Sequence, residues 1–476
     1  MLKARSAPLL MLALLSGCSL IPVYHRPAMS VATTYPVTGG GHGPAAYDIG
    51  WEQFFKDPAL QKLISLGLGN NRDLRVSVLK VEESQAQYRV SRASLFPTIN
   101  GDATFERTHT PANLSAAPNF REYSLSAQAV SWELDLFGQL RSKAAAQHQL
   151  YLSQVATTKA ARMALIAQIA SQYYTWQADR ESLNIAQQSA AADLHSLNLV
   201  QLELQHGVGT AMTLAQAQST YDTAQTSVAQ YQRQVAQDMN QLVLLLGAPI
   251  PDTLLMQMEA VNGLLAEPAL PQVPAGLPSD LLTRRPDIIA AEHQLLAANA
   301  NIGAARAAFF PSISLTASGG IASPTLASLF TSGQGAWSFE PHIDLPIFTG
   351  GENIANLDIA KVEKKIQIAD YQKTIQSAFR DVADALSARR TYDDEVKAQR
   401  NLVAANSRYY SLAQMRFTAG VDNYLNVLVA QNSLLSAKLT LVNLQLSQRQ
   451  NEITLYNALG GGWSAELPAH TAKKPD

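Results

Sequence analysis

The chain carries the same sequence pattern twice, and this duplication constrains its fold more than any other feature. Residues 90–99 read VSRASLFPTI and residues 304–313 read AARAAFFPSI, so that an arginine, a Phe-Pro pair and a final isoleucine fall in register. A second match joins residues 205–209 to residues 416–420, and both copies end in a Leu-Gly pair. A unit of about two hundred residues is far longer than a solenoid repeat, so the sequence predicts an internally duplicated fold.

Alternating strands are predicted at the same place in each copy. A helical pattern ends at Pro97 and at Pro311, because proline cannot continue a helix, and the pattern then changes to a period of two. The strand segments 97–134 and 311–347 each contain two such runs, close to the ~9–11 residues that a tilted strand needs to cross a bilayer. A half-buried sheet of a soluble protein gives the same alternation. Acidic residues on the polar face and aromatic residues near the strand ends favour a membrane.

If these strands span a membrane, one chain is not enough to enclose a pore. Single-chain barrels begin at about eight strands, so four strands require several chains to share one barrel. The acidic positions of the polar face would then point into the lumen and make the pore weakly cation-selective. These positions are Asp102, Glu106, Glu340 and Asp344.

Long helices are predicted after each strand pair. Residues 138–206 and 351–418 contain no proline, and the second segment would reach about 100 Å as one helix. Residues 177–183 are a candidate interruption of the first segment. Both segments turn at glycine and return as a second helix. Their many small residues allow close approach and suit a curved layer of helices, whereas a long coiled coil would need sustained leucine heptads.

The N-terminus has the features of a lipoprotein signal. In residues 1–17, two basic residues precede an apolar run that is too short to span a bilayer. The run ends in Leu-Ser-Gly before Cys18, the pattern that lipoprotein signal peptidase cleaves, so Cys18 is predicted to become a lipidated N-terminus. Ser19 follows where an aspartate would indicate retention in the inner membrane, which favours the outer membrane. An ordinary signal peptide with an incidental cysteine is the alternative.

Composition excludes several classes of function. Without residues 1–17 the chain has 34 basic and 38 acidic residues and no basic block, so no nucleic-acid partner is expected. One cysteine gives no disulfide framework, and no mature stretch stays apolar for the ~20 residues of a spanning helix. The nine histidines are scattered, and neither a nucleophile elbow nor a phosphate-binding loop occurs. We therefore expect neither an enzyme nor a cofactor, apart from the lipid.

Several motifs together resemble one family. Residues 281–288 (LLTRRPDI), the arginine-to-isoleucine motif that ends at Ile313, and residues 420–425 (GVDNYL) resemble the TolC-like outer membrane factors. The similarity is greatest to the NodT/OprM-type lipoproteins of resistance-nodulation-division (RND) efflux systems. It covers almost the whole mature chain, including Cys18 and the WEQFFKDP run at residues 51–58.

The resemblance implies a mixed α and β membrane protein that is a homotrimer. Four strands per chain would make a twelve-stranded outer-membrane barrel, continuous with a long periplasmic α-helical barrel, and a mixed equatorial domain would surround the helices. The chain would divide into a signal peptide (1–17), a lipidated equatorial segment (18–58), repeat 1 (59–247), a linker (248–279), repeat 2 (280–460) and a tail (461–476).

The implied function is passive conduction. An inner-membrane RND-type pump and a periplasmic membrane-fusion adaptor would deliver substrate, which would leave through the barrel in the outer membrane. An outer membrane duct for type I protein secretion and a non-conducting periplasmic scaffold lipoprotein are the alternatives. The exported compound is not encoded in any motif.

In such proteins the tips of the helical hairpins form the periplasmic gate. Here the tips map to residues 205–213 and 416–425. Three-fold symmetry would repeat Asp422 as a ring of carboxylates and Leu425 as a hydrophobic constriction, and Arg416 would hold the closed state through a contact between helices. Repulsion within the ring would raise some of the carboxylate pKa values unless Arg416 or a cation compensates.

A simpler alternative and two departures weaken the acidic gate. Asp422 could only cap the helix that follows Gly420, since aspartate is common at helix N-termini. Val429 and His206 stand where some relatives carry acidic residues, so the gate would contain fewer acids here.

Residues 284–287 (RRPD) form a second candidate site. Pro286 fits the first turn of a helix, and Asp287 would complement the helix dipole there. We favour this structural interpretation, a helix start with buried ion pairs, over a ligand site.

Overall fold

The computed structural model describes residues 19–28, 31–35, 44–111, 119–261, 263–264, 270–271, 273–274 and 280–462. The predicted signal peptide, Cys18 and most of the tail lie outside these residues. The chain divides into two compact units. Unit 1 comprises Met1–Met29, Lys80–Val155 and Ala290–Lys373, and unit 2 comprises Ser30–Leu79, Ala156–Ile289 and Thr374–Asp476.

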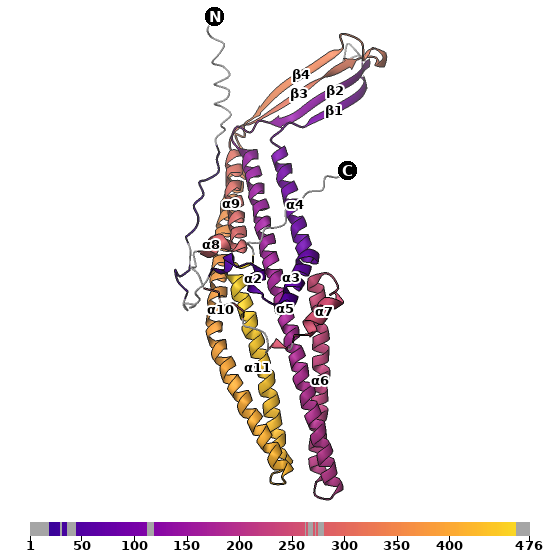
Figure 1. The fold of residues 1–476 in the computed structure, drawn as a ribbon. Coiled ribbons are helices and arrows are strands. Elements are labelled where there is room, and N and C mark those ends of the chain that lie inside the picture. Colours follow the sequence, from indigo (N-terminus) through magenta and orange to yellow (C-terminus); the bar gives the residue numbers. More distant parts are fainter. Residues whose placement is uncertain are drawn as a thin grey trace. The chain divides into compact units, whose positions relative to one another are not determined.

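A single antiparallel sheet dominates unit 1 (Figure 1). Its strands are β1 (Ile99–His109), β2 (Asn119–Glu133), β3 (Ser312–Ser323) and β4 (Gly335–Asp344), in that spatial order. All four lie within the segments predicted from alternation. The strand pairs of the two repeats therefore join edge to edge through β2 and β3.

Two local features shape the join between β2 and β3. A β-bulge separates the pairs at Ala129 and Trp132, and Ser131 within it has a positive φ of 51°. Only glycine fits at position 320 of β3, because the Cβ of any other residue would lie 2.1 Å from the carbonyl oxygen of Leu125. Next to the bulge, the Trp132 indole donates to the Leu95 carbonyl at 3.3 Å.

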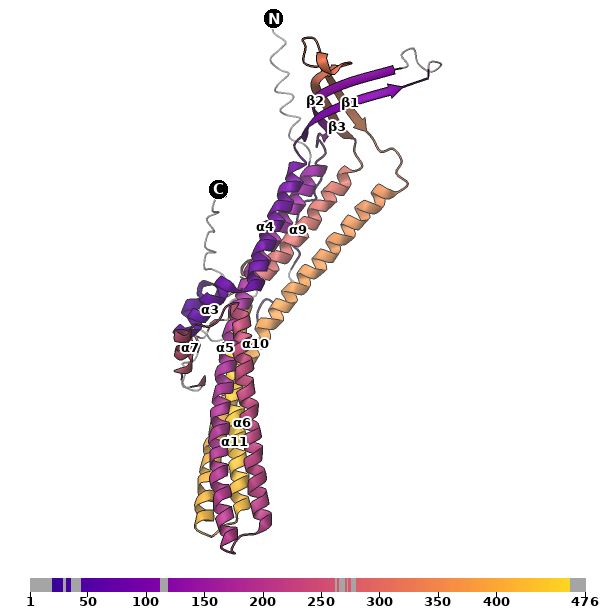
Figure 2. The same ribbon diagram turned by 90° about the vertical axis from the view of Figure 1, so that its right-hand side faces the viewer.

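Helical segments lead into the sheet at one end (Figure 2). They belong to α4 (Arg72–Ala93), α5 (Gln139–Gln205), α9 (Pro286–Ala307) and α10 (Glu352–Thr418), each of which contributes residues to both units. Within unit 1, small residues allow α5 and α9 to approach closely, as the buried cluster of Ala146, Ala297 and Ala300 shows. The Ser153 hydroxyl also donates to the Ala290 carbonyl at 2.9 Å.

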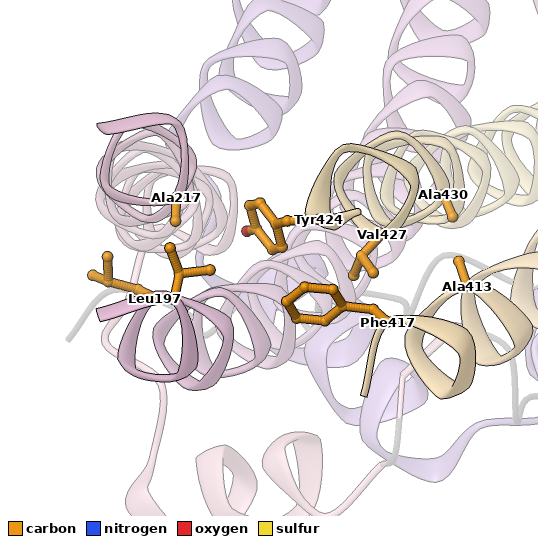
Figure 3. Packing of buried hydrophobic residues seen from close by; sticks show 8 residues of the cluster. Leu197, Ala217, Ala413, Phe417, Tyr424, Val427 and Ala430 are labelled. Atoms are coloured by element: carbon orange, nitrogen blue, oxygen red, sulfur yellow. The ribbon is translucent and has the colours of Figure 1, made fainter. Parts of the chain in front are cut away.

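Unit 2 contains two helical hairpins. One pairs the second part of α5 with α6 (Ala211–Leu246), and the other pairs the second part of α10 with α11 (Tyr424–Ala458). A cluster of buried apolar residues joins the hairpins near their tips (Figure 3). The rings of Phe417 and Tyr424 point from the second hairpin toward Leu197 of the first. The cluster comprises Leu197, Val200, Ala217, Ala413, Phe417, Tyr424, Val427 and Ala430.

The remaining elements of unit 2 are short. They are a 3-10 turn (Ala46–Asp48), α2 (Trp51–Phe54), α3 (Pro58–Asn70), α7 (Asp252–Glu259) and α8 (Leu281–Arg284). Their core is aromatic: Phe54 stacks on Tyr456 with centroids 4.0 Å apart, and the Tyr456 hydroxyl donates to the Ile49 carbonyl at 2.6 Å. A further 3-10 turn, η4 (Leu326–Ser328), lies between β3 and β4 in unit 1.

A polar side chain sets one helix boundary, and one expected interruption is absent. Asn71 separates α3 from α4, and its side chain accepts a bond from the Leu74 N–H at 2.8 Å and donates to the Leu245 carbonyl at 2.7 Å. The interruption expected at residues 177–183 is wrong, because α5 is one helix of 67 residues whose Gln177 and Ser182 are buried. The predicted linker at 248–279 contains the helix α7.

Helix α11 has the length and apolar composition of a membrane-spanning helix, although no such segment was expected. Among the described residues, it alone is long and apolar enough to cross a membrane by length and composition. However, its apolar residues form one side of the buried cluster in Figure 3. It also carries Glu452, which is 8% exposed and bonded to Arg389 at 2.7 Å. These features identify α11 as a packed helix of unit 2.

Candidate channel gate, lumen face and membrane anchor

The tip of the second hairpin is held by an ion pair. Helix α10 ends at Thr418, Gly420 turns the chain with a φ of +70°, and α11 begins at Tyr424. The Arg416 Nε donates to Asp422 Oδ2 at 2.6 Å and its Nη2 donates to Oδ1 at 3.2 Å. The Arg416 carbonyl accepts the backbone N–H of Asp422 at 3.3 Å. Two of the three residues predicted at the gate therefore clamp the turn across six residues.

This pairing decides the charge state of Asp422 in the single chain. The hydrogen bond from Arg416 lowers the pKa of Asp422, so the carboxylate is ionised at neutral pH. The capping alternative is wrong in detail, because the N-cap of α11 is Asn423, which makes no side-chain cap bond. The pKa rise expected from a ring of three carboxylates concerns an assembly and stays a prediction.

Both hairpin tips expose apolar side chains. Leu425 is 50% exposed on the first turn of α11, and Val421 beside it is 62% exposed. On the first tip, Gly207 has a φ of +77°, Thr210 caps α6 by accepting the Thr213 N–H at 3.1 Å, and Val208 is exposed. Apolar groups at the end of a hairpin can close a narrow pore by excluding water once several copies converge.

A buried acid near the second tip was missed by the sequence analysis. Asp193 on α5 is 3% exposed, and its Oδ1 has no hydrogen-bond partner in the part of the chain that the structure describes. Burial raises the pKa of Asp193 to about 6. It lies four residues before Leu197 and seven before Val200, both members of the buried cluster. That helical spacing is a signal that could have found it.

Two further acids face each other within the first hairpin. Asp179 on α5 and Asp238 on α6 both have raised pKa values because burial disfavours their charged forms, and the pKa of Asp179 reaches about 7. The Gln172 amide donates to Asp238 Oδ1 at 3.0 Å. The pair therefore shares a proton near neutral pH.

The four acids predicted to line the lumen occupy one face of the sheet. The register pairs Asp102 with Ser126, Glu340 with Thr316 and Asp344 with Ser312. The Gln128 amide donates to Asp102 Oδ2 at 2.9 Å across the β1–β2 pair. Because the same face continues across β2 and β3 through serine and glutamine, the sheet has one continuous polar surface.

One acid was missed on this face, and the opposite face is apolar. Glu122 lies directly opposite Glu106, which adds a carboxylate to the four predicted ones. The opposite face carries exposed large side chains such as Phe105, whose ring stacks on that of the half-buried Tyr123 with centroids 4.6 Å apart. Trp337 and Phe339 of β4 are exposed on this face as well.

The segment that follows Cys18 is tied along α9. The Pro22 carbonyl accepts from Asn299 at 2.8 Å, and the Leu20 carbonyl accepts from Arg306 at 3.3 Å. Arg26 holds Glu292 through two bonds of 2.8 Å. The segment at residues 19–28, which we call the strap, thus runs antiparallel to α9 and brings its first residue to the helix end that leads into β3.

The RRPD motif starts a helix. Pro286 is the first residue of α9, and Asp287 accepts the Ile288 N–H at 2.9 Å. Arg285 is nearly buried, with two bonds to Asp287 of 3.0 and 2.6 Å and one to the Ala458 carbonyl at 3.2 Å. These bonds show the structural role that the sequence analysis favoured. Arg285 and Asp287 also line an open cavity of about 680 Å³.

Comparison with known proteins identifies the class. The family model described as "Outer membrane efflux protein" matches residues 63–248 and again residues 277–461, once for each repeat. The antibiotic efflux pump outer membrane protein ArpC of Pseudomonas putida is 47% identical over 459 residues, which is 94% of each chain. The toluene efflux pump outer membrane protein TtgC, also of P. putida, has the same identity and coverage.

A solved structure matches the fold. It is the open state of the MtrE outer membrane channel of Neisseria gonorrhoeae, with a TM-score of 0.86 and 39% identity over 94% of this chain and 99% of that one. These comparisons confirm the predicted combination of strands and long helices, the outer membrane location and the efflux role. The chain therefore belongs to the outer membrane efflux protein family.

Proposed function

We propose that three copies of the chain form a gated outer membrane channel that conducts substrates passively. The observation that carries the proposal is the four-stranded sheet, which has one acidic polar face and one apolar face, and whose edge strands β1 and β4 have no further strand partner among the described residues. Long unpaired edges are a liability that closure into a barrel removes. Three copies would give twelve strands, which is enough to enclose a pore.

In this proposal the channel receives its substrate from other proteins. A periplasmic membrane-fusion adaptor and an inner-membrane RND-type pump would dock at the hairpin tips, whose exposed apolar side chains offer contact surface. The relatives are named for efflux of antibiotics, toluene and, for CusC of Escherichia coli, cations. Similar channels are thus named for different substrates. We therefore propose that the pump, and not the channel, selects the substrate. Efflux in the names of these relatives favours it over type I secretion.

The decisive experiment combines subunit count with conductance. Native mass spectrometry of the purified protein should give a trimer, and planar bilayers should show a low resting conductance. A monomer, or a trimer that never conducts, would support the non-conducting scaffold and contradict the channel.

The polar face of the sheet should set ion selectivity. Replacing Asp102, Glu106, Glu340 and Asp344 with the matching amides should abolish a weak cation preference, because ring carboxylates attract cations in a pore. Reversal potentials under a KCl gradient measure this preference. Glu82→Gln, on the exposed surface of α4, is the matched control and should leave the potential unchanged. A wild-type channel without cation preference would contradict the lumen assignment.

The strap should hold the lipid anchor in place. We propose that Cys18 is lipidated, and intact mass spectrometry should show the added acyl chains in the wild type but not in Cys18→Ser. Glu292→Ala should keep the lipid but loosen the strap, since losing a charged hydrogen-bonded pair costs about 1–3 kcal/mol. Hydrogen exchange of residues 19–28 should then rise about tenfold. Asp358→Ala, which removes an exposed pair with Lys361 in the same unit, should leave that exchange unchanged.

A further inference from the structure

The apolar face of the sheet carries two arginines that lie directly opposite each other. Arg107 on β1 pairs in register with Arg121 on β2, and both side chains are exposed. Strand alternation places them on the face of Phe105 and Tyr123, away from the polar face. Neither arginine makes a hydrogen bond or an ion pair within the part of the chain that the structure describes.

This arrangement lacks a counter-charge from the sheet. Like charges directly opposite on neighbouring strands destabilise the pair. The adjacent acids Glu106 and Glu122 belong to the other face, and Glu106 accepts a bond from the Thr108 hydroxyl at 2.9 Å there. An anion from outside the chain would supply the missing negative charge.

The pair lies at a defined level of the sheet. It is two residues beyond the stacked pair of Phe105 and Tyr123, toward the end of the β1–β2 hairpin that is remote from α4 and α5. Aromatic side chains of membrane barrels gather at the level of the lipid headgroups. If the helices lie on the periplasmic side, this end of the sheet reaches the headgroups of the outer leaflet.

We propose that Arg107 and Arg121 together bind a phosphate of an outer-leaflet phosphorylated glycolipid. Guanidinium groups bind phosphate through two parallel hydrogen bonds, which gives them geometric preference over lysine. The acyl chains of the same lipid would lie along the exposed Phe105 and Leu125. The inference rests on the proposed function, because it requires this face to contact lipid.

Native mass spectrometry with defined lipids tests the assignment. The probe is a bisphosphorylated, hexa-acylated glucosamine disaccharide, compared with the same lipid after removal of its phosphates. Wild-type protein should retain the phosphorylated lipid, and Arg107→Gln/Arg121→Gln should bind it about tenfold or more weakly. Arg107→Lys/Arg121→Lys should bind with intermediate strength because it keeps charge but loses the bidentate geometry.

The controls separate this site from general lipid contact. Arg89→Gln, an exposed residue of α4 on the helical part of unit 1, should retain the lipid as the wild type does. Equal binding of both lipids, or equal retention by the glutamine variant, would overturn the assignment, and so would displacement of the lipid by inorganic phosphate alone. Conductance separates this proposal from the proposed function. The glutamine variant should conduct like the wild type even though it binds the lipid weakly, whereas a wild-type protein that does not conduct would contradict the channel and not the lipid site.

Discussion

Conductance through an Asp422→Ser/Leu425→Ser variant is expected to rise several-fold above the low resting level of the wild type. The double change removes both features of the second tip: the carboxylate that Arg416 holds and the half-exposed leucine of the first helical turn. Hydrophobic constrictions gate by excluding water, so a hydroxyl at position 425 favours a hydrated pore. Single-channel recordings in planar bilayers measure the change.

Two further variants assign the effect to the tip. Arg416→Ala should also raise conductance, though less, because it frees the turn and keeps the leucine. Asp222→Ser/Leu194→Ser removes an exposed acid and an exposed leucine from the first hairpin outside the tips, and should conduct as the wild type does. Unchanged conductance in the double tip variant would show that the gate lies elsewhere.

The tip pair should not respond to pH in the physiological range. Arg416 lowers the pKa of Asp422, so the stabilising ion pair is fully present above the ordinary aspartate pKa of about 4. It is lost only as the pH falls through the lowered value. Any change in closure between pH 5 and pH 8 therefore has another origin.

Asp193→Asn is expected to stabilise the contact between the hairpins at pH 7.5 by on the order of 2–3 kcal/mol, since one pKa unit is about 1.4 kcal/mol. The pKa of Asp193 is raised to about 6 in the folded protein, above its ordinary value. The folded state then binds the proton more tightly than the unfolded one, so stability falls as pH rises from about 4 to 6. Above that range Asp193 is ionised, and the free-energy cost of burying its charge is fully present. The neutral amide of Asp193→Asn removes this cost.

Hydrogen exchange of α11 at residues 424–433 measures this effect. After correction for intrinsic rates, wild-type exchange should be faster at pH 7.5 than at pH 5, and Asp193→Asn should slow it about 30-fold at pH 7.5. The groups that face Asp193 include Ser189, Tyr410, Tyr424 and Gln431, whose side chains stay neutral across this range.

Two comparisons guard the interpretation. Asp222→Asn, which changes an exposed acid of the same hairpin, should leave the exchange of α11 unchanged. Asp179, whose pKa is raised to about 7, also titrates near neutral pH, but it faces Asp238 of α6, so its effect should appear in α6. Equal exchange of α11 in the wild type and Asp193→Asn at pH 7.5 would contradict a buried, ionised Asp193.

The sequence determined the local elements and the side chains on each face. Pro97 and Pro311 end helices and the alternation that follows has a period of two, so all four strands lie inside the predicted segments. The long proline-free segments became α5 and α10 nearly to the residue. These features follow from backbone chemistry and periodicity, which act over a few neighbouring residues.

Only the tertiary structure decided what depends on distant neighbours. The expected break in α5 is absent, and the polar side chains of Gln177 and Ser182 in that stretch are buried, which depends on packing against the rest of the chain. Asp193 became a titratable acid only because the second hairpin covers it, and Glu122 joined the acidic face through its register with Glu106. Burial and register join residues far apart in the chain, so local sequence patterns do not encode them.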